Sequence, residues 1–173
     1  MRTVELLFDP GLEAAVAAAW DRLAAAGLPS LAHHTHPSNR PHVTLGTATT
    51  LPSRARAGVE AALAALPLPV GLGGLVTFPG RRRALVWEVT PSPGLRELQA
   101  AVWRALPEDP RRNPVHRPRN WRPHATLARS ASPGRIAEAA ELLADLPRPR
   151  GHLVAARSYD DHSRTVARLV PRP

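Results

Sequence analysis

The sequence predicts an α+β fold with an internal duplication: two mainly antiparallel sheets related by a pseudo-twofold axis, helices on the outer faces and a central cleft. Two observations predict it. Residues 40–45 (RPHVTL) and 122–127 (RPHATL) differ at one position, and their histidines, His42 and His124, are 82 residues apart. Around each copy, the same order of apolar runs, proline-marked helix starts and Leu-Pro-x-Pro segments recurs, which indicates that the whole unit is repeated.

The first half reads as strand, helix, strand, helix, strand. An apolar run at residues 3–8 predicts a strand, and residues 9–11 (DPG) supply a polar N-cap followed by proline at the first helical position. A proline-rich connection leads into the RPHVTL strand, and Pro52 marks a second helix that ends at residues 66–69 (LPLP), because proline cannot continue a helix. A strand near residues 71–78 then ends in a Pro-Gly turn.

The second half repeats this order. Residues 84–90 predict a strand, and two Ser-Pro-Gly segments, at residues 92–94 and 132–134, predict the starts of two helices on either side of the RPHATL strand. A Leu-Pro-Arg-Pro segment ends the second of these helices. Strands near residues 153–159 and 165–170 follow, joined by an Asp-Asp turn.

Composition predicts one bilobal domain spanning residues 1–173, with repeat halves of about 1–81 and 82–173. The 173 residues are 43% hydrophobic, which is enough to form a core. There is no cysteine, so disulfides, thiolate metal sites and cysteine nucleophiles are excluded. The first residues do not read as a signal peptide, and no apolar stretch is long enough to span a bilayer. We therefore expect a cytoplasmic, monomeric, single-domain protein with no membrane partner.

The charge indicates a polyanionic partner. The formal net charge is +9, the sequence pI is about 11.6, and every basic residue is an arginine. A field of this sign attracts polyanions such as RNA, and the guanidinium group binds phosphate with two parallel hydrogen bonds. A GC-rich genome also favours arginine codons over lysine codons. The choice of arginine is therefore not taken as a sign of RNA binding, and only the excess of positive charge is.

The repeated motif places acid–base groups in pairs. Residues two apart on a strand point to the same face, so His42 lies beside Thr44 and His124 beside Thr126, while the residues between them face the core. One histidine can remove a proton from an attacking hydroxyl while the other protonates the departing oxygen. A threonine hydroxyl can donate to a phosphate oxygen. This set suits in-line displacement at a phosphodiester and requires no metal. A single His-x-Thr is more often a structural pair on a half-buried strand, but its duplication favours a site.

The two motifs, with Trp121 ahead of the second and Ala128-Arg129 behind it, resemble the signatures of the two-histidine (2H) phosphoesterase superfamily. The closest resemblance is to its bacterial 2′-5′ RNA ligase-like, RNA 2′,3′-cyclic phosphodiesterase branch. It extends over essentially the whole chain and implies a bilobal fold that opens cyclic phosphates without a metal or other cofactor. It also implies that His42 and His124 form the acid–base pair and that Thr44, Thr126 and Arg129 bind the phosphate.

Four residues beside the two motifs are candidates for contacts with the substrate. Strand alternation places Arg129 on the face opposite His124, so its role at the phosphate requires a bulge or a strand end; Thr47 takes its place in the first motif. Arg40 and Arg122 lie two residues before the histidines and share their face if the strands are regular there, so both are candidate substrate contacts. The proline that follows each arginine can also mark the start of the strand, which would break this geometry. Trp121 is a candidate for stacking on a nucleobase. It lies three residues before His124, however, and this odd spacing places it on the core-facing side of a regular strand.

These features predict a metal-independent phosphodiesterase that opens the 2′,3′-cyclic phosphate end of RNA or of a nucleotide. Two alternatives remain open. The same site would also suit a 2′-5′ oligonucleotide phosphodiesterase or ligase, and a non-catalytic RNA-binding module would keep the same pocket. The sequence does not distinguish the acid from the base. The cluster of His33, His34 and His36 reads as a solvated loop rather than a metal site.

Overall fold

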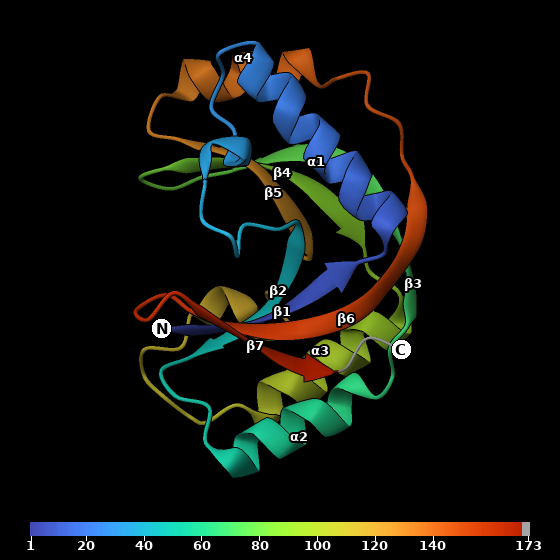
Figure 1. Ribbon diagram of the computed structural model, residues 1–173, viewed down its shortest axis with the longest axis vertical. Coiled ribbons are helices and arrows are strands. Elements are labelled where there is room, and N and C mark those ends of the chain that lie inside the picture. The colour runs from blue at the N-terminus through green and yellow to red at the C-terminus, as the bar shows by residue number, and fades with distance from the viewer. Residues whose placement is uncertain (171–173) are drawn as a thin grey trace.

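The computed structural model describes residues 1–170 of the chain (Figure 1). All the helices and strands expected from the sequence are present. In chain order they are β1 (Arg2–Phe8), α1 (Pro10–Ala25), the 3₁₀ turn η1 (Leu31–His33), β2 (His42–Ala48), α2 (Ser53–Leu63), β3 (Leu68–Phe78), β4 (Arg83–Thr90), α3 (Pro93–Ala105), the 3₁₀ turn η2 (Pro114–His116), β5 (His124–Ser130), α4 (Pro133–Leu142), β6 (Arg150–Asp160) and β7 (Thr165–Val170).

All four helices begin where the sequence predicts, three of them at a polar N-cap followed by proline. Asp9, Ser92 and Ser132 are N-caps whose side chains accept a backbone N–H from the third residue that follows, and proline occupies the first helical position after each. Helix α2 begins after Pro52 without a side-chain cap. The expected turns join β3 to β4 and β6 to β7.

The strands form one sheet, not two. All seven belong to a single antiparallel sheet in the order β2-β1-β6-β3-β4-β5, with β7 paired to β6. The expectation of two sheets is therefore wrong. The reason is the length of β3 and β6, which have 11 residues each. Both are long enough to pair with each other over residues 68–71 and 150–153 and still pair with a second strand further along.

The strand order is symmetric about the β3–β6 pair. Exchanging β1 with β4, β2 with β5 and β3 with β6 leaves the order unchanged. This symmetry is what a repeated strand–helix–strand–helix–strand unit would produce. The duplication itself, its boundaries and the central cleft stay predictions.

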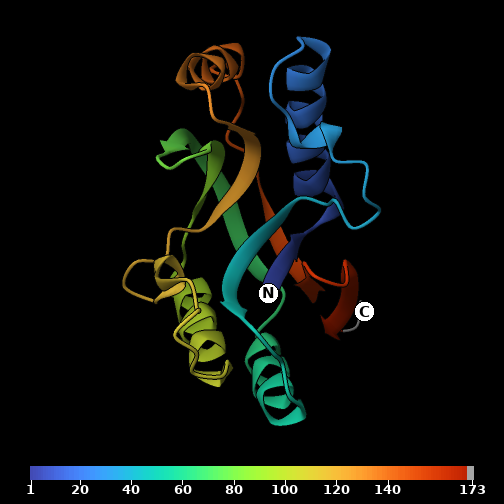
Figure 2. The ribbon, with the colours of Figure 1, turned by 90° about the vertical axis from the view of Figure 1, so that its left-hand side faces the viewer.

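The helices lie at two ends of the molecule, with strands between them (Figures 1 and 2). Helices α1 and α4 occupy one end, where both contact β5, and α2 and α3 occupy the other, where α3 contacts β2. Thus α1, from the first half of the chain, packs on a strand of the second half, and α3 does the reverse. The two ends of the molecule therefore do not coincide with the two halves of the sequence.

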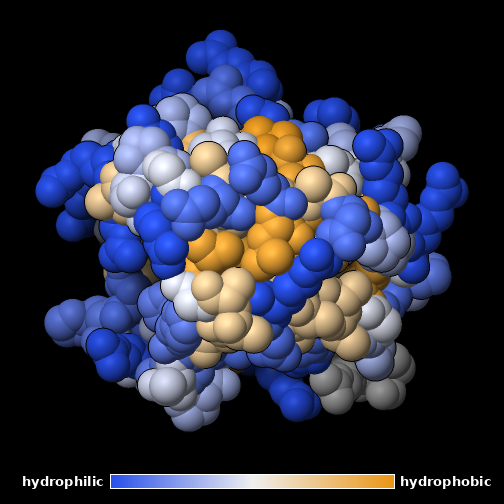
Figure 3. Space-filling view, turned by 90° about the horizontal axis from the view of Figure 1, so that it is seen from above, coloured by the Kyte–Doolittle hydropathy of each residue, from blue (hydrophilic) through white to orange (hydrophobic). Residues whose placement is uncertain are grey.

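A single apolar core joins the helices to the inner face of the sheet. It includes Leu6, Val43 and Leu127 from the strands and Leu12 and Leu98 from the helices, all of them buried. Seen from the end that carries α1 and α4, the surface is mostly hydrophilic, with a smaller apolar area near its middle (Figure 3). None of the helices in residues 1–170 combines the length and apolar character needed to cross a bilayer.

Candidate active site

The two His-x-Thr motifs lie on the two outermost strands of the main sheet order. His42 is the first residue of β2 and His124 is the first residue of β5. The sheet curls so that these two strands contact each other, although they stand at opposite ends of the order. The curl brings together two motifs that are 82 residues apart in the sequence.

Both imidazoles are held in the same way. The Nδ1 of His42 lies 2.7 Å from the carbonyl oxygen of Arg40, and the Nδ1 of His124 lies 2.7 Å from that of Arg122. A carbonyl only accepts, so Nδ1 carries the hydrogen and Nε2 is left as the atom that exchanges protons. Two histidines with the same orientation and a free Nε2 suit proton transfer in opposite directions.

The Arg-Pro pair in each motif has a backbone role. A residue that precedes proline is restricted to extended conformations. This restriction applies to Arg40 and Arg122, whose carbonyls receive the histidine hydrogen bonds. The repeated Arg-Pro-His sequence therefore orients the imidazole through its backbone, independently of what the arginine side chain contacts.

The arginine side chains themselves are engaged with carboxylates. Arg40 forms two hydrogen bonds with Glu13, each 2.5 Å long, and Arg122 donates to Glu88 at 2.6 Å and lies over the ring of Phe78. Both arginines precede the first residue of their strand, as the proline signal suggested. A phosphate would have to compete with a carboxylate for either guanidinium group.

The predicted alternation holds through each motif. Val43 and Ala125 are fully buried, whereas the flanking histidines and threonines are partly exposed. Beyond each threonine, the register shifts by one residue. Glu5 pairs with Thr44 and Val4 with Gly46, while Val86 pairs with Thr126 and Leu85 with Ala128. One extra residue, Leu45 in β2 and Leu127 in β5, is thus accommodated at the same place in both strands.

The shift in β5 changes the position of Arg129. An extra residue reverses the alternation beyond it, so Arg129 returns to the face that carries His124 and Thr126. Its side chain is exposed, and its charge helps to lower the pKa of His124. The alternation argument against Arg129 was wrong because it assumed a regular strand. Thr47, at the matching place in β2, is buried and accepts the backbone N–H of Asn113.

His124 lies in a setting that favours its neutral form. Burial contributes most to lowering its pKa, and the positive charges of Arg129, His42 and Arg122 lower the pKa further; the hydrogen bond to the Arg122 carbonyl acts in the opposite direction. The ring of Phe78 packs edge-on against the imidazole at 4.8 Å between centroids. A neutral imidazole with a free Nε2 is a proton acceptor.

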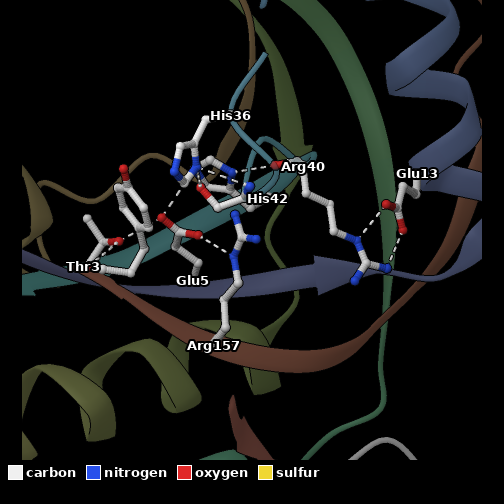
Figure 4. A network of polar contacts seen from close by, with 9 residues as sticks. Thr3, Glu5, Glu13, His36, Arg40, His42 and Arg157 are labelled. Carbon is white, nitrogen blue, oxygen red and sulfur yellow. Dashed lines mark hydrogen bonds and ion pairs between the residues drawn. The ribbon is translucent and has the colours of Figure 1, made fainter. Parts of the chain in front are cut away.

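His42 lies beside a buried ion pair (Figure 4). One carboxylate oxygen of Glu5 is 3.7 Å from His42 Nε2, and the other accepts a 2.7 Å hydrogen bond from Arg157. Thr3 donates to the first oxygen at 2.6 Å. The sequence analysis missed this group. Its signal was a glutamate in the middle of the apolar run at residues 3–8, which is an unusual place for a charge.

Trp121 packs inside the protein. Its side chain is buried, and Nε1 donates to the backbone carbonyl of Thr44 at 2.8 Å, leaving the ring no exposed face for a nucleobase. Trp20 in α1 makes the corresponding bond to the carbonyl of Thr126 at 2.9 Å. Since β2 and β5 have a strand neighbour on one side only, these indoles satisfy carbonyls on their open sides and fix the backbone of both motifs.

A third histidine lies close to the site. Burial is the main cause that lowers the pKa of His116, in η2, to about 4, and the charge of His124 adds to it. Its Nδ1 is buried without a hydrogen-bond partner among the described residues. His33 and His34 are exposed, and His36 bonds to Ser38. Within residues 1–170, no three histidine or carboxylate side chains gather closely enough to hold a metal ion.

Comparisons with known proteins agree with this arrangement. The family model described as "2'-5' RNA ligase superfamily" matches residues 10–158. Among solved structures, Usb1 of Kluyveromyces marxianus is 15% identical with a TM-score of 0.59, and its complex with uridine monophosphate is 14% identical with a TM-score of 0.55; each match covers 98% of this chain and 97% of the other. These structural matches show a shared fold. No curated protein matches the sequence significantly.

Proposed function

This chain belongs to the 2′-5′ RNA ligase superfamily of two-histidine phosphoesterases, and on that premise we propose that it opens the 2′,3′-cyclic phosphate end of RNA or of a nucleotide. The observation that carries the proposal is the matched pair of imidazoles. His42 and His124 have identical Nδ1 anchors and lie on strands that contact each other, so both Nε2 atoms are available to one substrate.

The reaction follows from the different settings of the two histidines. Neutral His124 takes a proton from water through Nε2 as the water oxygen forms a bond to phosphorus. The bond from phosphorus to one ribose oxygen breaks, and that oxygen receives the proton of His42. Atoms and charge balance, since the enzyme gains one proton at His124 and loses one at His42. A phosphomonoester is the product.

Three side chains are suited to holding the phosphate. Thr44 and Thr126 lie two residues after the histidines on the same face, where their hydroxyls can donate to non-bridging oxygens as negative charge develops. Arg129 returns to this face after the shift in β5 and adds a permanent positive charge. None of these steps requires a metal ion.

A product assay tests the proposal directly. The purified protein is incubated with 2′,3′-cyclic mononucleotides and with RNA ending in a cyclic phosphate, and the 2′- and 3′-phosphate products are resolved. Acid–base catalysis typically contributes about 10²- to 10⁴-fold, so His42→Ala and His124→Ala should each lower kcat by that order. His34→Ala, at an exposed histidine, is the matched control. Unchanged turnover in the double His42→Ala/His124→Ala variant would overturn the proposal.

A second reaction uses the same residues. The family model's own description, a 2′-5′ RNA ligase superfamily, favours a 2′-5′-linked oligonucleotide that is cleaved or joined at the same phosphate. Incubating the protein with 2′-5′- and 3′-5′-linked dinucleotides of the same sequence distinguishes the two activities. Cleavage restricted to the 2′-5′ linkage, with cyclic phosphates left intact, would favour this second reaction.

The substrate class is supported by charge. The net charge of +9 favours a polyanion, and the uridine monophosphate bound to Kluyveromyces marxianus Usb1 is a nucleotide in the same fold. A cytoplasmic location and a monomeric state belong to the same proposal. Light scattering during gel filtration tests the second of these.

A further inference from the structure

One row of paired residues runs from the first motif to the last strand of the chain. Thr44 of β2 pairs with Glu5 of β1. Glu5 pairs in turn with Arg157 of β6, and Arg157 pairs with Arg168 of β7. Residues directly opposite one another in a sheet share a face. Arg168 therefore lies on the same face as the histidine and threonine of the first motif, at the far end of the row.

A cavity of about 110 Å³ lies among β1, β6, β7 and the segment that precedes β2. Three of its lining residues are arginines, Arg40, Arg157 and Arg168, and the others are apolar. The first two also border the imidazole of His42. The carbonyl of Arg40 accepts from its Nδ1, and Glu5, the partner of Arg157, lies 3.7 Å from its Nε2 (Figure 4). The cavity is therefore next to the proposed acid–base site.

The positive charge of Arg168 has no carboxylate partner within residues 1–170, and its side chain is exposed. The other two arginines of the cavity are each paired with a glutamate, Arg40 with Glu13 and Arg157 with Glu5. Arg168 also stands directly opposite Arg157, and like charges in that position are destabilising. An anion bound at Arg168 would offset this repulsion.

We propose that this cavity binds a second phosphate of the substrate, the one that joins the terminal nucleotide of an RNA chain to the nucleotide before it, with Arg168 as its charged ligand. The inference rests on the proposed function and names its substrate, an RNA end rather than a nucleoside 2′,3′-cyclic phosphate. Arginine suits this role because its planar guanidinium group holds a phosphate with two parallel hydrogen bonds. The apolar residues around it strengthen its field.

The size of the cavity fits one phosphate group. Pockets that hold a whole small-molecule ligand measure about 300–1,000 Å³, so a cavity of about 110 Å³ is too small for a nucleoside. The cavity therefore suits a single charged group of the chain, while the bases and sugars lie outside it.

The backbone that carries Arg168 is held in place. Its carbonyl oxygen accepts a 2.6 Å hydrogen bond from Arg56 of α2. The next residue, Leu169, is 4% exposed and belongs to the apolar core. The guanidinium group of Arg168 therefore extends from a fixed position on β7.

The second half of the chain has no matching cavity ligand. Its row runs from Thr126 of β5 through Val86 of β4 to Val76 of β3, so valines stand where the first half has Glu5 and Arg157. Within residues 1–170, no strand extends this row as β7 extends the other. The RNA chain should therefore leave the reacting phosphate on the side of the first motif.

Three substrates with the same base separate this role from catalysis. Uridine 2′,3′-cyclic phosphate has no second phosphate, its 5′-phosphorylated form has a terminal one, and the dinucleotide UpU with a 2′,3′-cyclic end has one that joins two nucleotides. The wild-type protein should have its highest kcat/KM on the dinucleotide. Arg168→Gln should lower kcat/KM about tenfold for the dinucleotide and by no more than about twofold for uridine 2′,3′-cyclic phosphate, because the residue lies away from the reacting phosphate.

Two variants serve as controls. Arg168→Lys keeps the positive charge and should restore part of the preference for the dinucleotide. Arg96→Gln, at an exposed position of α3, removes the same net charge and should affect all three substrates equally. An equal loss on all three substrates in Arg168→Gln, or the same loss of preference in Arg96→Gln, would overturn the inference. A preference for the 5′-phosphorylated mononucleotide without one for the dinucleotide would contradict RNA as the substrate.

A binding measurement keeps this test independent of the proposed function. If the wild-type protein opens no cyclic phosphate, the proposed function fails, but its affinities for uridine 3′-monophosphate and for UpU with a 3′-phosphate can still be compared by calorimetry. We expect the dinucleotide to bind the wild type about tenfold more tightly, and most of this advantage to be lost in Arg168→Gln. Equal affinities in the wild type, or an undiminished advantage in the variant, would show that Arg168 holds no second phosphate.

Discussion

At the scale of single residues, His116 combines burial with an unsatisfied polar atom. Its pKa falls from 6.5 to about 4, mainly through burial, and its Nδ1 has no partner among the described residues. The imidazole is therefore kept neutral by its surroundings. Protonating it inside the folded protein would place a charge in a poorly solvated position close to His124.

We predict that His116 makes the protein less stable in mild acid. Because its pKa is lower in the folded state, the unfolded state binds more protons between pH 6.5 and pH 4. The stability that depends on neutral His116 is complete above pH 6.5 and is lost as the pH falls towards 4. His116→Gln should therefore lose less stability than the wild type between pH 7 and pH 4.5 in urea unfolding. His34→Gln is the exposed control, and a wild-type decline in His116→Gln would contradict the prediction.

A second prediction concerns Arg129. Its positive charge is one of the causes that lower the pKa of His124, so its removal should raise that pKa. Since the proposed base must be neutral, Arg129→Gln should move the acidic limb of the kcat profile to higher pH. Loss of a charged phosphate ligand should also lower kcat/KM by about 10- to 100-fold, equivalent to about 1.4–2.7 kcal/mol. Arg135→Gln, at a partly exposed arginine of α4 that is paired with Glu138, is the matched control and should change neither quantity.

Repeated residues were easier to recognise in the sequence as candidates for the site than unrepeated ones. His42, Thr44, His124 and Thr126 stood out because they occur twice at the same spacing. Glu5 occurs in one half only, and its ion pair partner, Arg157, is 152 residues away. Such a pair depends on which strands become neighbours, and periodicity along one strand contains no information about that.

At the scale of elements, each motif strand is held by an indole from elsewhere in the chain. Trp121 donates to Thr44 in β2, and Trp20 donates to Thr126 in β5. We predict that Trp121→Phe removes about 1 kcal/mol of stability with the lost hydrogen bond, and lowers kcat severalfold because the open side of β2 is less firmly held. Trp20→Phe should act in the same way on β5. Thermal unfolding and kcat measured on both variants check this.

Comparison of the two indole variants provides the control. Each keeps an aromatic ring but loses the pyrrole part of the indole as well as its N–H, so the cavity adds to the loss of stability and kcat is the quantity that reports on the position of the motif. An effect on stability with unchanged kcat in both variants would contradict a role in positioning the motifs.

Sequence patterns predicted the elements well and their irregularities poorly. Caps such as Asp9 and Ser92, with proline after them, placed the helix starts because these signals are local. The register shifts at Leu45 and Leu127 were not predicted, since both leucines stand where regular alternation expects an apolar residue. That omission led to the wrong face for Arg129.

At the scale of the whole molecule, the continuous sheet and the packing of α1 and α3 on strands of the opposite half tie both halves into one core. We predict that Leu45→Ala and Leu127→Ala, two fully buried positions in matching strands, each cost about 2–5 kcal/mol. Unfolding should remain a single transition in both variants. Coincident curves from near- and far-ultraviolet circular dichroism check this, and a separate early transition in either variant would show that the halves unfold independently.

The repeated motifs were visible in the sequence, but the way the strands that carry them are joined was not. Repeated motifs predicted two similar units, and separate sheets were the simplest arrangement of them. The single sheet depends on four residue pairs at the N-terminal ends of β3 and β6, where residues 68–71 pair with residues 150–153. The helix positions depend on packing between segments far apart in the chain. Neither is encoded in the local periodicity of one segment.

The crossed positions of α1 and α3 have a consequence for the predicted duplication. A polypeptide equivalent to residues 1–81 would have its own strands but would lack the helix that covers β2, since α3 comes from the other half. Two copies could complete each other by exchanging helices, as in a domain-swapped homodimer. In such a pair the two histidine motifs would have identical surroundings, whereas in this chain Glu5 lies beside His42 alone.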